Sequence, residues 1–169
     1  MDVKPDSQLK RLLDAHGDRV FRLCLRLTGG CHAEAEDLAQ ETLLAALKAL
    51  PRFGGRARQS TWLHAIAVNL WRKHQARREP ATLALHENDQ PLPDGAARQL
   101  LRLSLDEAIA SLPDPLREAF VLVKAEGLTH REAAQVLGIP QGTVQTRVHD
   151  AIKRLRVLLA DWNGKGNER

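Results

Sequence analysis

The chain has 169 residues, a net charge of +4, few aromatic side chains and no Tyr. This length suits one or two domains, and the dominance of Leu and Ala over Val and Ile predicts an all-α protein rather than a β-sheet fold. No apolar run reaches the about 18 residues of a transmembrane helix, and the start, Met-Asp-Val-Lys-Pro-Asp, has no apolar signal core. These features argue against membrane insertion and predict a cytoplasmic protein.

Apolar residues recur at helical spacing three times between residues 5 and 79, which predicts a unit of three helices. Gly17 is expected to be a weak point in the first helix. The predicted helices and their end signals are 7–28, ended by Gly29-Gly30; about 33–50, stopped by Pro51; and 62–78, capped by Ser60 or Thr61. The apolar positions expected to form the core are Leu9, Leu12, Leu13, Val20, Leu23, Cys24, Leu27, Leu38, Leu43, Leu44, Leu47, Leu50, Leu63, Ile66, Ala67, Leu70 and Trp71.

Charge is unevenly distributed along this first unit. An acidic cluster, Glu34, Glu36, Asp37 and Glu41, is followed by a stretch from Thr42 to Arg78 that holds no Asp or Glu. A basic stretch of this length suits a polyanion such as nucleic acid, although a solvated surface is the alternative. Its basic residues are Lys48, Arg52, Arg56, Arg58, Arg72, Lys73, Arg77 and Arg78.

Cys24, Cys31 and His32 are the only residues that suggest metal or redox chemistry. Cys24 lies on the apolar stripe of the first helix, where a cysteine behaves as a small core residue. The three do not follow a recognised zinc spacing. We therefore expect no metal site and no cofactor.

A linker is predicted over 80–98, because Pro, Gly and acidic residues gather there and only Arg98 supplies a positive charge. A second helical unit is expected over 99–160, with helices near 99–111 and 115–126 and a frayed tail over 161–169. Its expected core comprises Leu105, Ile109, Leu112, Leu116, Phe120, Val123, Leu128, Val136 and Leu137.

The second unit contains the pattern of a helix-turn-helix. Thr129 and Glu132 have the spacing of a capping box, which opens a helix. Gly138 can take the left-handed conformation that ends it, and Pro140 suits the start of the next helix. Small Ala134 allows the two helices to approach closely, as a DNA-reading helix pair requires.

The last helix separates into an apolar stripe and a polar face. Gln and Thr side chains can read base edges, and basic residues contact the phosphate backbone. An αα-hairpin with a solvated face is the alternative. The stripe consists of Val144, Val148, Ile152 and Leu155, and the polar face of Gln141, Gln145, Thr146, His149 and Lys153, with Arg154 and Arg156 nearby.

Together these parts resemble an extracytoplasmic-function (ECF) sigma factor, a compact member of the sigma-70 family of promoter-recognition subunits of bacterial RNA polymerase. The resemblance covers about residues 9–158 and depends on three segments in this order. They are Ala35-Glu-Asp-Leu-Ala-Gln-Glu41, Thr61-Trp-Leu-His-Ala-Ile-Ala-Val-Asn69, and a third running from Leu112-Pro through Gly127-Leu-Thr and Glu132-Ala-Ala to Gly142-Thr-Val.

The resemblance implies that 5–79 is sigma region 2, which docks on the clamp helices of the polymerase β′ subunit and opens the −10 element. The implied docking residues are Glu36, Asp37, Gln40 and Glu41. The implied −10 contacts are Arg56, Arg58, Trp62, Asn69, Arg72 and Lys73, with Trp62 either at the duplex fork or, as we favour, in the core. The loop 53–59 corresponds to the segment that captures an unstacked base, although Arg58-Gln59 stand where relatives often have an apolar residue.

The resemblance further implies that 99–160 is sigma region 4, which reads the −35 element and meets the β flap. Base edges would be faced by Gln145, Thr146 and His149, and phosphates by Thr143 and Arg147. Asp150 is a departure, because a basic residue is common there, and a carboxylate can accept from cytosine, repel phosphate or cap an Arg. The linker would thread the polymerase cleft or act as a plain tether, and an anti-sigma factor is an implied partner.

Other classes fit less well. A helix-turn-helix regulator of the response-regulator type would need an α/β domain before the linker, where no strand-like alternation occurs. An enzyme would need a catalytic arrangement, and the His and acidic residues are scattered. A helical adaptor that binds only protein would leave the acid-free stretch unexplained.

Overall fold

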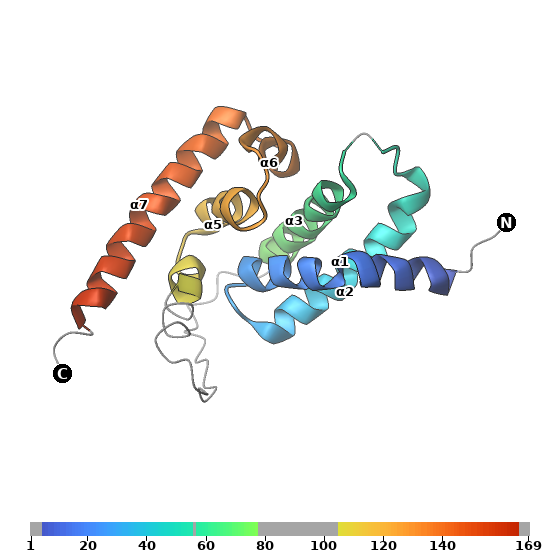
Figure 1. The fold of residues 1–169 in the computed structure, drawn as a ribbon, viewed down its shortest axis with the longest axis horizontal. Helices are drawn as coiled ribbons and strands as arrows, with labels where there is room; N and C mark the ends of the chain where they lie inside the picture. Colours follow the sequence, from blue (N-terminus) through green and yellow to red (C-terminus); the bar gives the residue numbers. More distant parts are fainter. Residues whose placement is uncertain (1–4, 56, 78–104, 166–169) are drawn as a thin grey trace.

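The structure is a computed structural model that describes residues 5–55, 57–77 and 105–165. All regular secondary structure in these ranges is helical, as the composition predicted, and the helices form two groups that lie side by side (Figure 1). Within the same ranges, no helix is both long enough and apolar enough to cross a bilayer. The linker predicted over 80–98 lies outside the described residues, as does Arg56.

The first group consists of α1 (Pro5–Leu27), α2 (His32–Ala49) and α3 (Gln59–Arg77). α2 packs against both of the other helices, and α1 also contacts α3. The turn after α1 uses Gly29 and Gly30 at φ of 69° and 91°, a region that glycine adopts without strain. The predicted three-helix unit is therefore present, and it needs this glycine pair to reverse direction between α1 and α2.

The details of these three helices differ from the sequence expectation in several places. α1 runs through Gly17 without interruption. Pro51 ends α2 by opening a short 3-10 turn, Leu50–Arg52. The cap predicted at Ser60 or Thr61 is wrong, because α3 begins at Gln59 and both residues lie inside it.

One stripe of each helix forms the core of this group, and the predicted stripes were too wide. Leu13 and Leu44 were expected inside but are 44% and 50% exposed. In a three-helix unit, packing against the other two helices buries only part of each helix surface. An apolar residue at the edge of that part can therefore stay exposed to solvent. The buried apolar residues are Leu12, Val20, Leu23, Cys24, Leu27, Ala35, Leu38, Ala39, Leu43, Ala46, Leu63, Ala67, Val68 and Trp71.

The second group contains a helical segment over 105–110, α5 (Asp114–Phe120), a π-helical turn η2 (Val121–Ala125), α6 (His130–Leu137) and α7 (Gln141–Lys165). The helix predicted near 115–126 is thus divided between α5 and η2. α7 continues through 161–165, the first part of the tail that was expected to be frayed. α5 and α6 both pack against α7.

The helix-turn-helix signals are confirmed in detail. The backbone N–H of Glu132 donates to Oγ1 of Thr129 at 3.2 Å, and the Thr129 N–H donates to Oε2 of Glu132 at 2.9 Å. Gly138 ends α6 with φ of 65°, and α7 begins directly after Pro140. Burial of Val144 and Val148 anchors α7 against α5 and α6.

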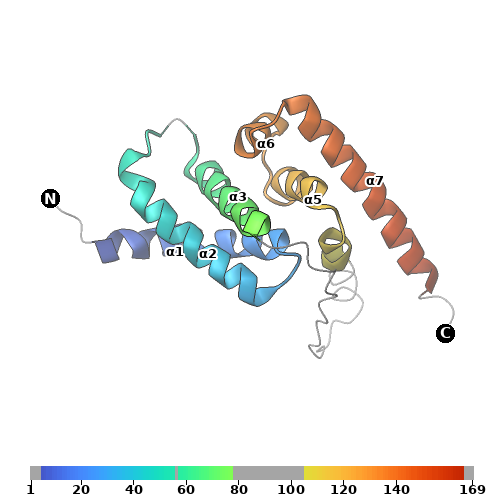
Figure 2. The same ribbon diagram turned by 180° about the vertical axis from the view of Figure 1, so that it is seen from behind.

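The two groups contact each other directly. α6 packs beside α3, and α1 contacts α5 and η2 (Figure 2). At Gly29 the approach is close, since a Cβ added there would lie 3.4 Å from the Cβ of Ala110. Leu105, expected in the core of the second group, is 38% exposed.

Candidate nucleic-acid interface

The polar face of α7 is open to solvent while its opposite side is buried. Val144, Val148 and Leu155 are buried against the second group, so the intervening residues point away from it. The turn at Gly138 sets α7 against α6, so that one side of the N-terminal half of α7 is packed and the other is exposed, the arrangement that a major-groove reader needs. The exposed residues of this face are Gln141, Gln145, Thr146, His149 and Lys153.

Two further residues of α7 were expected to contact DNA. Thr143 and Arg147 are half-buried, a depth that fits contact with a phosphate at the groove edge better than contact with a base. The hydroxyl of Thr146 donates to the backbone oxygen of Gly142 at 3.1 Å. That bond holds the Thr146 side chain against its own helix and leaves oxygen lone pairs free to accept.

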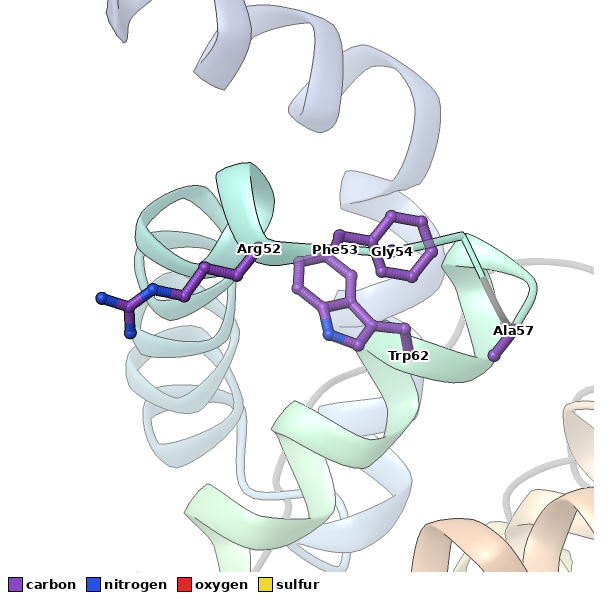
Figure 3. A pocket seen from close by; sticks show the side chains of 5 residues that line it. All are labelled: Arg52, Phe53, Gly54, Ala57 and Trp62. Atoms are coloured by element: carbon purple, nitrogen blue, oxygen red, sulfur yellow. The ribbon is translucent and has the colours of Figure 1, made fainter.

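A second feature is an aromatic pocket at the start of α3. The rings of Phe53 and Trp62 lie with centroids 4.7 Å apart and planes inclined at 36°. They line an open pocket of about 460 Å³ together with Arg52, Gly54 and Ala57, and the Arg52 side chain points away from the ring pair (Figure 3). Trp62 is half-buried, so one ring contributes to the core and to the pocket wall at once. Flat aromatic walls of this kind suit a stacked base.

The polar residues expected to contact the −10 element fall into two environments. Arg58 in the loop, and Asn69 and Lys73 on α3, are exposed. Arg72 is instead engaged with the second group: its Nη2 donates to Oε2 of Glu118 at 2.7 Å. Pairing of Arg72, an expected phosphate contact, with a carboxylate was not predictable from residue spacing.

A third feature is the acidic face of α2. Glu36, Asp37, Gln40 and Glu41 are all exposed, as a docking surface requires. Asp37 and Glu41 are one helical turn apart and can meet the same partner.

Several charged residues that sequence reasoning missed meet where the two groups touch. Glu126 is buried against Arg19, Arg26 and His64, and Glu118 against Arg72. The sequence feature that could have indicated a buried carboxylate was the position of Glu118 directly before an apolar run from Ala119 to Val123. Their partners could not be deduced, since each lies at least 46 residues away.

The cysteines lie in different surroundings. Cys24 is fully buried, and burial raises the pKa of its thiol to about 12 against an opposing hydrogen bond with Thr42. Cys31 is half-buried near the start of α2, and the ring of His32 lies 5.7 Å from that of Phe21. In the part of the chain described here, no three His, Cys, Asp or Glu residues converge as metal ligands would.

The chain matches two family descriptions and several characterised relatives. Residues 12–80 match "Sigma-70 region 2" and residues 102–155 match "Sigma-70, region 4". The ECF RNA polymerase sigma factor SigW of Bacillus subtilis is 34% identical over 165 residues, covering 89% of this chain and 88% of SigW. SigL of Mycobacterium tuberculosis is 33% identical over 159 residues, covering 90% of this chain and 89% of SigL.

Two solved structures are similar in fold. One is the sigma factor RpoE in complex with the anti-sigma factor NepR from Bartonella quintana, with a TM-score of 0.71 and 24% identity over 90% of this chain and 97% of RpoE. The other is CnrH in complex with the cytosolic domain of CnrY, with a TM-score of 0.67 and 25% identity over 92% of this chain and 90% of CnrH.

Proposed function

The chain belongs to the ECF sigma factors of the sigma-70 family, and we propose that it docks on core RNA polymerase through α2 and reads two promoter elements through α3 and α7. As a sigma factor it directs promoter-specific initiation of transcription. It catalyses no reaction of its own in this proposal, and it acts in the cytoplasm, where the polymerase is. DNA reading is assigned on one observation, the exposed polar face of α7. This helix follows α6, which begins with a complete capping box and ends at Gly138 in the left-handed conformation.

We assign the −35 element to α7 and the −10 element to α3 with the loop before it. Residues Gln145, Thr146 and His149 would face bases, and Thr143, Arg147 and Lys153 phosphates. The pocket that Phe53 and Trp62 help to line would receive the unstacked base, since an aromatic wall stacks on any base. This proposal divides the chain into region 2 over 5–79, the linker over 80–98 and region 4 over 99–160.

The polymerase would meet this chain at two surfaces. The exposed acidic face of α2 suits the clamp helices of β′, because carboxylates four residues apart can both pair with Arg side chains. Region 4 would contact the β flap on a side away from α7's polar face. The structures of RpoE with NepR and of CnrH with CnrY support an anti-sigma partner for this chain too.

Reconstitution with core RNA polymerase and mapping of transcript starts across a genome tests the whole proposal. We expect a shared pair of elements upstream of the starts, at constant separation. A purified chain that does not associate with the polymerase, or that associates and never directs initiation, would overturn it.

A further inference from the structure

Asp150 places an exposed carboxylate on the polar face of α7. It follows buried Val148 by two residues, which at about 100° per residue puts it almost opposite that side chain around the helix. Thr146, one turn earlier, and His149, directly before it, are exposed as well. Figures 1 and 2 show α7 at the edge of the molecule, where this face can meet a ligand. The carboxylate therefore stands among the side chains assigned to base edges.

The carboxylate of Asp150 has guanidinium groups within reach along its own helix and pairs with neither. Arg147 precedes it by three residues and Arg154 follows it by four, spacings at which helical side chains can meet. Within the described ranges, Asp150 forms no hydrogen bond or ion pair. By contrast, Asp114 and Arg117, also three residues apart, do form a pair at the start of α5. Asp150 thus keeps its acceptor oxygens for a group outside the chain.

An ionised carboxylate accepts hydrogen bonds and donates none, which limits what it can contact in a DNA groove. Phosphate oxygens repel it, as do O6 and N7 of guanine and O4 of thymine. The donors in the major groove are the amino groups of adenine and cytosine. The adenine amino group lies between two acceptors, N7 of the same base and O4 of the paired thymine, whereas the cytosine amino group has an acceptor on one side only. Cytosine is therefore the base whose edge suits Asp150 best.

We propose that Asp150 sets the sequence preference at one base pair of the −35 element, by accepting a hydrogen bond from the N4 amino group of a cytosine. This assignment rests on the proposed function of α7 as the −35 reader. Asp150 also rejects the other bases, because without a donor the carboxylate is left desolvated beside phosphates and base acceptors. The basic residues around it supply the phosphate attraction that keeps the carboxylate in the groove; they are Arg147, Lys153 and Arg154.

The position of Asp150 along α7 limits which base pair it reads. It lies one turn beyond Thr146, about 6 Å at a rise of about 1.5 Å per residue. Successive base pairs are about 3.4 Å apart, so we expect the two side chains to contact base pairs about two steps apart or closer. The position at which Thr146→Ala loses preference therefore marks where the effect of Asp150 should be found.

Transcription from a promoter library tests the assignment. The reconstituted holoenzyme receives a promoter found by transcript mapping, with every −35 base pair randomised, and the transcribed templates are sequenced. The wild type should favour cytosine over the other bases on the order of tenfold at the position that Asp150 contacts. Asp150→Ala should remove this preference and leave those at the other positions in place. Asp150→Arg should favour guanine there instead, since Arg pairs with O6 and N7 of that base.

The control is Glu107→Ala, which removes an exposed carboxylate of the same unit outside the helix-turn-helix and changes the net charge equally. Its base preferences should match those of the wild type. If Asp150→Ala raised transcription from all templates by the same factor, Asp150 would only repel phosphate. Unchanged preferences in Asp150→Ala, or a cytosine preference that survives in Asp150→Arg, would show that the carboxylate contacts no base. Each of these three results overturns the assignment.

Failure of the sigma assignment gives a different result. A wild-type chain that does not join the polymerase, or joins it and starts no transcript, refutes that assignment. The same chains are then compared without polymerase, by sequencing the duplexes that each retains from the library. Loss of one cytosine preference in Asp150→Ala would still support the base contact, and no difference between the chains would overturn it.

Discussion

Nε2 of His74 lies 2.9 Å from Oε2 of Glu41, which joins α3 to the exposed acidic face of α2. Glu41 is one of the residues proposed to dock on the polymerase, and its side chain is 51% exposed despite this contact. A partner can therefore reach the carboxylate from outside. Since surface pairs of this kind contribute at most about 1 kcal/mol, an Arg from the polymerase can replace His74 at little cost.

The acidic face of α2 gives the first prediction. Replacing Asp37 and Glu41 with Lys should abolish holoenzyme formation, because two attractive charges become repulsive, while helix content stays unchanged. Co-purification with core polymerase measures it. Asp14 and Asp18 offer a matched control, since they are also exposed and four residues apart but lie on α1. Undiminished co-purification of the Asp37→Lys, Glu41→Lys chain would refute this docking surface.

The Phe53–Trp62 pocket gives the second. Trp62→Ala should weaken capture of the unstacked base by about 1–3 kcal/mol, the usual worth of one base–aromatic stack, and Trp62→Phe should retain most of it. Permanganate reactivity of thymines near the start site reports opening by the reconstituted holoenzyme. If Trp62→Ala lowered thermal stability and left opening at its wild-type level, the ring would serve only as packing.

Gln145 on α7 gives the third. Gln145→Ala should cost on the order of 1–3 kcal/mol at one base pair of the −35 element if the contact is bidentate. Transcription from a set of promoters, each changed at one −35 position, measures it. The variant should lose discrimination at a single position and keep it elsewhere. An equal loss on every promoter would instead make Gln145 a non-specific contact.

The capping box gives the fourth. Thr129→Ala removes the oxygen that accepts from the Glu132 N–H and should lower the stability of region 4 by about 1 kcal/mol. Thr129→Ser keeps that oxygen and should lose much less. Hydrogen bonds from Thr129 lower the pKa of Glu132. The stability that the Glu132 carboxylate contributes is therefore fully present above the ordinary Glu pKa, and it is lost as the pH falls through the lowered pKa of the folded state. Urea unfolding at pH 7 measures the free energy of unfolding of the wild type, Thr129→Ala and Thr129→Ser. Equal values for the three would contradict a stabilising role of the cap.

The two thiols give the fifth. Cys24 is fully buried with its pKa raised to about 12, whereas Cys31 is half-buried. At pH 8 a thiol reagent should therefore modify Cys31 promptly and reach Cys24 only after unfolding in guanidinium. A Cys31→Ser chain should show no prompt reaction. Prompt reaction of both thiols in the native wild type would mean that the α1–α2 core opens readily.

The sequence predicted best the parts of the fold that depend on neighbouring residues. Thr129, Glu132 and Gly138 specify the start and end of α6 through contacts within a few positions, and all three behave as expected. The start of α3 was missed because Ser60 and Thr61 are good caps that this helix does not use. Leu13 and Leu44 were placed in the core because periodicity marks a face without saying how much of it a partner covers.

The candidate site was predictable to a similar extent. The exposed faces of α2 and α7 follow from spacing along single helices. Pairing of Glu126 with Arg19 spans 107 residues, and nothing in the chain links the two positions. The contact between the rings of Phe53 and Trp62 depends on how the loop between α2 and α3 folds back, and local spacing does not describe that path.

The meeting surface of the two halves contains three carboxylate–guanidinium pairs. Such groups regain water readily on separation, unlike leucine or phenylalanine side chains. At these three pairs, separation of the halves would expose charged groups to water rather than apolar side chains. These pairs would therefore contribute little aggregation-prone surface if the halves parted.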